Sequence, residues 1–144
     1  MRLKSPEFEN NQFIPEEFTC DGKDSNPPLI IEDIPKKTTS LALTVDDIDT
    51  PMIIWAHWLV FNIPVTSKIK ANSVPGIQGV NTSSKITYHG PCPPFGIHRY
   101  VFKIYALDKL LSLKEGATKK QLMKAIKGHI LDKAELIGLY KRVK

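Results

Sequence analysis

GPCPPFGIHRYVFKIYAL, from Gly90 to Leu107, joins a loop to a strand. Its first half holds three prolines and two glycines, which predicts a shaped loop with restricted backbone freedom. Its second half alternates, because Tyr100, Phe102, Ile104 and Ala106 fall on one face and Val101, Lys103 and Tyr105 on the other. That period of two predicts a strand over 99–107. The loop therefore delivers His98 and Arg99 to the start of a strand.

Four other segments have the same character. They are SLALTVDD (40–47), HWLVFNI (57–63), KITYH (85–89) and AELIGLYKR (134–142), each rich in branched or aromatic residues and bounded by turn-forming residues. Residues 1–28 and 64–84 are predicted to be loop-rich. One helix is predicted to start at Thr118, because TKKQ is a capping box, and Gly128 is expected to close it.

Strands followed by one late helix predict a mainly β fold: an antiparallel β-sandwich with a peripheral helix in the C-terminal region. The length of 144 residues fits one domain over 1–144. No apolar run approaches the roughly 18 residues of a membrane span, and the N-terminus has no apolar signal region. We therefore expect a cytoplasmic protein.

The net charge of +5 is unevenly distributed. Residues 114–144 hold nine Lys or Arg and three Asp or Glu, a net of +6. The simpler interpretation is a solvated helix face and tail, and the alternative is an anionic partner. No aromatic residues interleave with the basic ones, so nucleic acid binding is not predicted.

Two cysteines, Cys20 and Cys92, stand far apart in the chain and outside any CxxC or zinc-type cluster. We interpret them as two reduced, partly buried thiols. A bridge between two loops is the alternative that spacing leaves open.

Polar residues gather where predicted strands meet loops. Asp47 and Asp49 are two apart, so extended backbone turns both carboxylates to one side. His57 lies in an apolar run, and His98 and Tyr100 share one face of the next strand. Gly90 would let backbone N–H groups approach a ligand. The simpler interpretations are turn-forming aspartates and a core histidine. The sequence has no metal-binding motif, nucleophile elbow or P-loop, so neither a metal nor another cofactor is predicted.

Several motifs together resemble the phosphatidylethanolamine-binding protein family, which includes the Raf kinase inhibitor proteins, and in particular its short bacterial and archaeal members. The motifs are CDG (20–22), NPPL (26–29), DIDTP (47–51), AHW (56–58), GPCPPFGIHRY (90–100) and GHILDKAELIGLY (128–140). They occur in order from about residue 13 to residue 142. Ile48 and Thr50 stand where the family pattern has Pro and Ala.

The resemblance implies two antiparallel sheets with Greek-key connections and a small pocket for a phosphate-like or carboxylate-like anion. Carried over by position, it implies a pocket made of Asp47, Asp49, His57, Gly90, Pro91, His98 and Tyr100. Arg99 matches the family arginine, and strand alternation predicts that it points away into a structural ion pair.

The leading functional hypothesis is a module that binds phosphate, a phosphoethanolamine-like head group or a phosphorylated side chain. In it the aspartates hold His57 and His98 protonated as donors. The second hypothesis is inhibition of a kinase or protease through the pocket loops. The third is weak hydrolase or lyase activity from His57 with Asp47 or Asp49. A homodimer is compatible with the short prokaryotic relatives.

Overall fold

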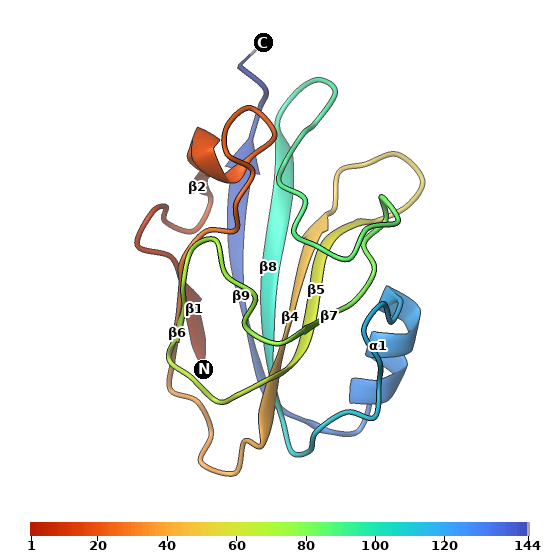
Figure 1. The fold of residues 1–144 in the computed structure, drawn as a ribbon. Helices are drawn as coiled ribbons and strands as arrows, with labels where there is room; N and C mark the ends of the chain where they lie inside the picture. Colours follow the sequence, from red (N-terminus) through yellow and green to blue (C-terminus); the bar gives the residue numbers. More distant parts are fainter. Residues whose placement is uncertain (144) are drawn as a thin grey trace.

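The computed structural model describes residues 1–143, which form two sheets and one α-helix (Figure 1). The large sheet has the order β2 (Gln12–Phe13), β9 (Ile130–Tyr140), β8 (His98–Leu107), β4 (Ser40–Asp47), β5 (Trp55–Ile63) and β7 (Ile77–Gln78). Its strands pair antiparallel except for β2 with β9. The small sheet has the antiparallel order β1 (Arg2–Lys4), β3 (Leu29–Glu32) and β6 (Lys68–Ile69).

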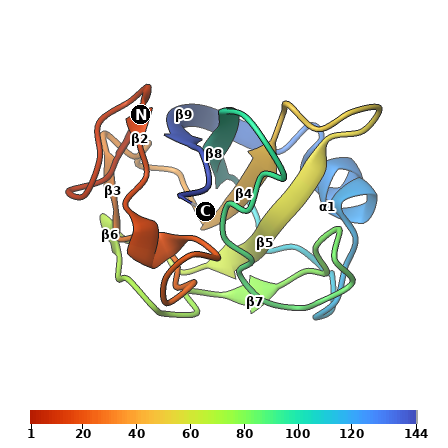
Figure 2. The ribbon, with the colours of Figure 1, turned by 90° about the horizontal axis from the view of Figure 1, so that it is seen from above.

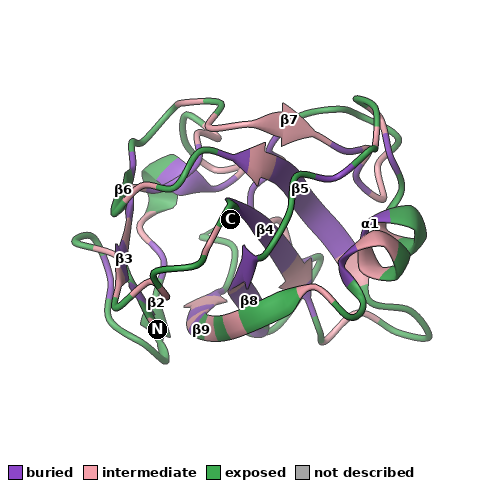
Figure 3. Cartoon of the chain, turned by 90° about the horizontal axis from the view of Figure 1, so that it is seen from below, coloured by how far each residue is buried: buried purple, intermediate pink, exposed green. Residues whose placement is uncertain are grey.

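The large sheet is buried on both faces. One face packs against the small sheet through a cluster that joins Leu3 and Ile31 to Leu43 and Phe102. The other face packs against α1 (Lys119–Ile126) through Leu122 and Ile126, among others. Strand β4 therefore has almost no exposed residue, as Figure 3 shows from below. The result is three layers, with the small sheet, the large sheet and the helix in that order.

The mainly β fold with one late helix is confirmed, and most predicted elements hold. Strand β4 has the predicted bounds, while β5, β8 and β9 start earlier than predicted. The capping box is present: Thr118 accepts from the Gln121 N–H, and Gln121 accepts from the Thr118 N–H. Gly128 has φ +83°, as expected of a residue just beyond a helix end.

The predicted strand KITYH is wrong. Residues 85–89 form no strand. The carbonyls of Ile86 and Thr87 accept hydrogen bonds from the side-chain amides of Gln78 and Asn81, where a strand would accept them from backbone N–H groups. The alternation that suggested a strand comes from Tyr88, which is buried and donates to the Phe18 carbonyl at 2.7 Å. The segments predicted to be loop-rich hold the short strands β1, β2, β6 and β7 and the 3₁₀ turn Glu16–Phe18.

The two cysteines form a disulfide, which corrects the prediction of reduced thiols. Cys20 and Cys92 have Cα atoms 5.5 Å apart across a separation of 72 residues. Spacing gave no hint of this, because the contact depends on how the loop after the 3₁₀ turn folds over the proline-rich loop. The Cys20 N–H also donates to the Pro91 carbonyl at 3.2 Å.

We predict that the disulfide contributes about 3–4 kcal/mol to the free energy of unfolding, because it closes a long loop in the unfolded chain. The measurement is urea denaturation of the parent with and without dithiothreitol. The double variant Cys20→Ala/Cys92→Ala is the control, and reductant should leave its midpoint unchanged. Two free thiols in the denatured, unreduced parent would contradict the prediction.

Candidate functional site

The register of three strands brings the site together. Asp47, the last residue of β4, pairs with Trp55 on β5 and with Tyr100 on β8. Paired residues place their side chains on the same face of a sheet, so these three form a row across the strands. Figure 2 looks down on this end of the molecule, where β4 ends and β5 and β8 begin. The proline-rich loop after Tyr88 lies over the same end.

A cavity of about 550 Å³ lies above this row. Its polar lining comes from Asp47, Thr50, His57, His89 and Tyr100, and its apolar lining from Pro51, Met52, Ile53, Trp55, Cys92, Pro93 and Pro94. Two other hollows have similar volumes, about 600 Å³ beside β1 and about 670 Å³ beside α1. Neither contains a buried ionisable side chain, so the cavity above Asp47 is the candidate site.

Asp47 is the buried carboxylate of the site. Its Oδ2 lies 2.7 Å from Nδ1 of His98, which is also buried. Its Oδ1 accepts the Asp49 backbone N–H at 2.9 Å. The His98 contact places that histidine behind Asp47, and His98 does not line the cavity. Asp47 therefore links the cavity floor to a buried imidazole.

Asp49 lies outside the cavity, contrary to the expectation that it faces the same way as Asp47. Because Asp47 accepts the N–H of Asp49, the chain turns after β4, and the extended geometry that would align both carboxylates is lost. Asp49 instead binds Arg99 with both oxygens, at 3.0 Å from Nε and 2.7 Å from Nη2. The Arg99 guanidinium keeps the pKa of Asp49 below its ordinary value. The ion pair predicted for Arg99 is confirmed.

His57 is bonded to a backbone carbonyl and has a lowered pKa, contrary to the expectation that aspartates hold it protonated. Its Nδ1 lies 2.6 Å from the His89 carbonyl oxygen, and no carboxylate of residues 1–143 forms a hydrogen bond or ion pair with its ring. Burial lowers the pKa of His57, although the His89 carbonyl and the charges of Asp47 and Asp46 oppose this in part. The His57–Asp dyad on which the hydrolase hypothesis depends is therefore not formed.

Tyr100 presents a buried hydroxyl without a partner. Its side chain is fully buried, and its ring meets that of His57 edge-on, with centroids 5.3 Å apart. Within residues 1–143 its oxygen has no hydrogen bond of normal geometry, although the Asp47 side chain and the Cys92 backbone lie close enough to affect its pKa. Burial raises the pKa of Tyr100 well above its ordinary value, and the Asp47 charge raises it further. The hydroxyl therefore remains protonated and has one hydrogen bond to donate.

Gly90 and Pro91 come directly before Cys92, Pro93 and Pro94, which line the cavity. The Gly90 N–H donates to Asp24 at 2.7 Å, and a Cβ atom on Gly90 would lie 2.3 Å from the same Asp24 oxygen. Glycine is thus required here for packing against the loop at Asp24. Neither Gly90 nor Pro91 lines the cavity.

Sequence reasoning missed His89 as a site residue. The ring of His89 stacks on that of His57, with centroids 5.5 Å apart and planes at 10°. The wrong prediction of a strand over 85–89 is the reason, because it made His89 the last residue of a strand and not a loop residue. Its position next to Gly90 was the one available signal. Within residues 1–143, no group of three metal-ligating side chains exists, and no helix is long and apolar enough to cross a membrane.

Comparison with known proteins shows the family of this chain. The family model described as phosphatidylethanolamine-binding protein matches residues 4–141. The chain belongs to the phosphatidylethanolamine-binding protein family. It is 45% identical to the UPF0098 protein of Methanothermobacter thermautotrophicus and 43% identical to that of Chlamydia muridarum, each over 99% of both chains.

Solved structures of the phosphatidylethanolamine-binding protein family agree with this fold. The chain superposes on a putative phosphatidylethanolamine-binding protein homolog of Chlamydia trachomatis with a TM-score of 0.94 and 41% identity, over 98% of this chain and 97% of that one. Escherichia coli YbcL shares the fold, with a TM-score of 0.90 and 24% identity over 98% of each chain.

We predict unequal effects from removing the two aspartates. Asp47→Ala leaves the buried His98 without a partner and should lower the free energy of unfolding by about 3 kcal/mol. Asp49→Ala breaks a partly exposed pair and should cost about 1 kcal/mol or less. Urea denaturation of both variants measures this, and equal losses would contradict the assignment of Asp47 as the buried member.

Proposed function

We propose that the cavity binds a small phosphate-like anion, as a free ion or as the head group of a larger ligand. The observation that carries the proposal is the Tyr100 hydroxyl, which is buried beside the cavity with no hydrogen-bond partner. A buried polar group without a partner costs free energy, and a ligand oxygen that accepts a hydrogen bond from the hydroxyl would offset that cost.

The Asp47 carboxylate is the obstacle to an anion. Both of its oxygens already have a partner, because Oδ2 lies 2.7 Å from Nδ1 of His98 and Oδ1 accepts the Asp49 N–H at 2.9 Å. A ligand in the cavity then meets the Tyr100 donor and the His57 ring without facing a carboxylate oxygen that lacks a partner.

The protonation of the ligand supports phosphate in particular. A phosphate monoester has a second pKa of about 6, so its monoanion carries one P–OH group. That group can donate to the free nitrogen of neutral His57 while another oxygen accepts from Tyr100. The dianion bound to a protonated His57 carries the same total number of protons as the monoanion bound to a neutral His57. In both cases the complex holds one proton more than the free dianion and the neutral ring together.

The apolar lining supports a ligand larger than inorganic phosphate. Trp55, Met52 and Pro94 line a cavity of about 550 Å³, and apolar surface of this kind stabilises an attached organic group. A phosphoethanolamine-like head group or a phosphorylated side chain fits this description.

The first test uses calorimetry with phosphate and phosphoethanolamine. Tyr100→Phe removes only the unpartnered hydroxyl, so the variant should fold at least as stably as the parent and bind either ligand at least about tenfold more weakly. Tyr105→Phe is the matched control, because Tyr105 lies on the same strand and packs toward α1. No heat from either ligand with the parent would refute the proposal.

The second test uses sulfate, which carries no proton in the tested range. Because burial lowers the pKa of His57, sulfate requires proton uptake at that ring. The sulfate Kd should rise about tenfold per pH unit above the pKa of His57 in the free protein, which lies below about 6.5, and should level off below that pKa. His57→Gln should flatten this profile.

The lowered pKa of His57 also predicts that the folded protein becomes less stable as pH falls below about 6.5, since the unfolded chain takes up the proton more readily.

Inhibition of a kinase or protease is the second candidate function. Exposed apolar side chains flank the cavity mouth, with exposures of 101% for Met52, 55% for Ile53 and 81% for Phe95, and such surfaces often mark protein contacts. Capture of a partner that is lost in Met52→Ser/Phe95→Ser, with small-anion binding unchanged, would favour this candidate. Capture that survives the double variant would count against it.

A further inference from the structure

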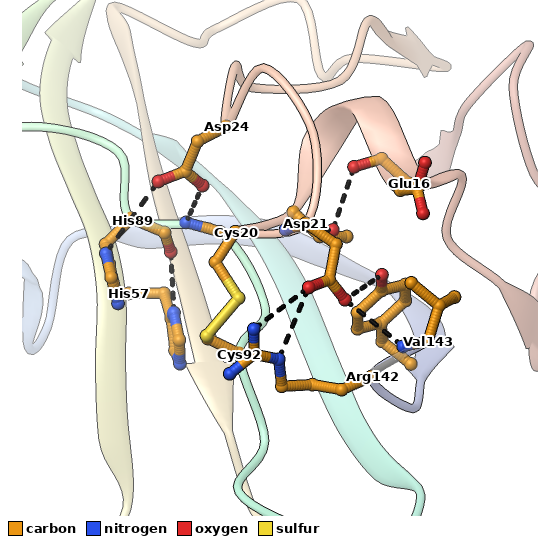
Figure 4. The surroundings of a disulfide bond; sticks show 12 residues. Glu16, Cys20, Asp21, Asp24, His57, His89, Cys92, Arg142 and Val143 are labelled. Carbon is orange, nitrogen blue, oxygen red and sulfur yellow. Dashed lines mark hydrogen bonds and ion pairs between the residues drawn. A yellow bond between two sulfur atoms is a disulfide. The ribbon is translucent and has the colours of Figure 1, made fainter.

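One peptide unit is held from both of its sides. The peptide between His89 and Gly90 contributes the carbonyl that contacts Nδ1 of His57 at 2.6 Å and the N–H that donates to Asp24 at 2.7 Å. A trans peptide is planar, so its C=O and N–H point in opposite directions and cannot turn independently. A contact made by Asp24 outside the cavity therefore fixes the direction of a carbonyl on the inside. Figure 4 shows this chain of contacts.

The loop that carries Asp24 is itself fastened to the wall. Cys20 is joined to Cys92 by the disulfide, and the Cys20 N–H donates to Pro91. A second carboxylate of the same loop, Asp21, faces away from the cavity and accepts from Tyr140, Arg142 and the Val143 N–H (Figure 4). The loop thus holds the cavity wall with Asp24 and the C-terminal segment with Asp21.

The contact with the carbonyl determines where His57 carries its proton. A carbonyl oxygen only accepts hydrogen bonds, so Nδ1 must be the protonated nitrogen of the neutral ring. The other nitrogen, Nε2, has no hydrogen bond within residues 1–143 and belongs to a ring that lines the cavity. In this tautomer Nε2 is an acceptor, and it becomes a donor only when the ring takes up a second proton.

We propose that Asp24 is a positioning residue that fixes the tautomer of His57 through the His89–Gly90 peptide. The consequence for ligands rests on the proposed function. With Nδ1 protonated, an anion that has no proton of its own binds only together with a proton. The opposite tautomer would offer an N–H to the anion directly, and the requirement for proton uptake would disappear.

Other groups around His57 do not supply this control. His89 stacks on the ring, Tyr100 meets its edge, and the charges of Asp47 and Asp46 act on it from β4, but none of their side chains hydrogen-bonds Nδ1. Asp24 also lies 4.0 Å from Nδ1 of His89, whose ring stacks on that of His57. The peptide is the direct route by which Asp24 reaches His57.

Nitrogen-15 NMR of the histidine rings in the protein without ligand tests the proposal. The parent should show His57 as the Nδ1–H tautomer. Asp24→Ala should lower the ratio of Nδ1–H to Nε2–H by about fivefold, the change expected when a hydrogen bond of typical strength is lost. Asp24→Asn keeps an acceptor for the Gly90 N–H and should restore the parent spectrum.

Asp21→Ala is the matched control. It removes a carboxylate three positions away in the same loop, together with four hydrogen bonds to three residues of the C-terminal segment. It should lower the free energy of unfolding but leave the His57 tautomer unchanged. An Nε2–H tautomer in the parent, or the same tautomer ratio in the parent and in Asp24→Ala, would overturn the proposal. Equal tautomer shifts in Asp21→Ala and Asp24→Ala would also overturn it, because they would indicate general loosening of the loop.

Sulfate binding separates this inference from the proposed function. If both hold, Asp24→Ala should reduce the uptake from about one proton per sulfate toward zero, as measured by the pH dependence of the Kd. If the parent binds no anion but the tautomer responds to Asp24, the proposed function fails and the positioning role stands. If anions bind and the tautomer does not respond, the positioning role fails alone.

Discussion

The pairing of Asp47 with residues on both sides is the constraint on which the site depends. The end of β4 is held between β5 and β8, in register with Trp55 and Tyr100. A slip of β4 by one residue would turn Asp47 to the other face of the sheet and so remove it from the row with Trp55 and Tyr100. That register is enforced by burial, because β4 packs on the small sheet with one face and on α1 with the other. The same packing that stabilises the fold therefore builds the floor of the cavity.

The polar groups of the cavity are each held by a partner that lies outside it. Asp47 is bonded by His98, and the His57 ring is bonded by the His89 carbonyl, whose peptide is in turn held by Asp24. Within residues 1–143, the Tyr100 hydroxyl and Nε2 of His57 are left without a hydrogen-bond partner. A site whose side chains are already oriented loses little conformational entropy when a ligand binds. The disulfide and the prolines of the 90–94 segment serve the same end, because they restrict the wall before any ligand arrives.

Much of the fold could be predicted from the sequence, since the long strands carry a clear period of two and the helix carries its own capping box. The short strands could not, because two or three residues are too few to establish a period and form only against a sheet that already exists. KITYH misled for a related reason: its alternation comes from a buried Tyr88 and not from pairing with a strand. At the site, the two-residue spacing predicted that the carboxylates of Asp47 and Asp49 face the same way. This was wrong because the backbone turns after Asp47 and is not extended there. The disulfide and the contact of Asp24 with Gly90 join positions remote in the chain, so no local pattern indicates them.

The central claim is that an anion occupies the cavity and bonds to Tyr100. A crystal structure of the protein soaked with tungstate, which mimics phosphate and scatters X-rays strongly, tests it most directly. We predict one tungstate above the β4 end, within hydrogen-bond distance of the Tyr100 hydroxyl and of Nε2 of His57. An ordered tungstate bound elsewhere on the surface, with the cavity holding water alone, would contradict it.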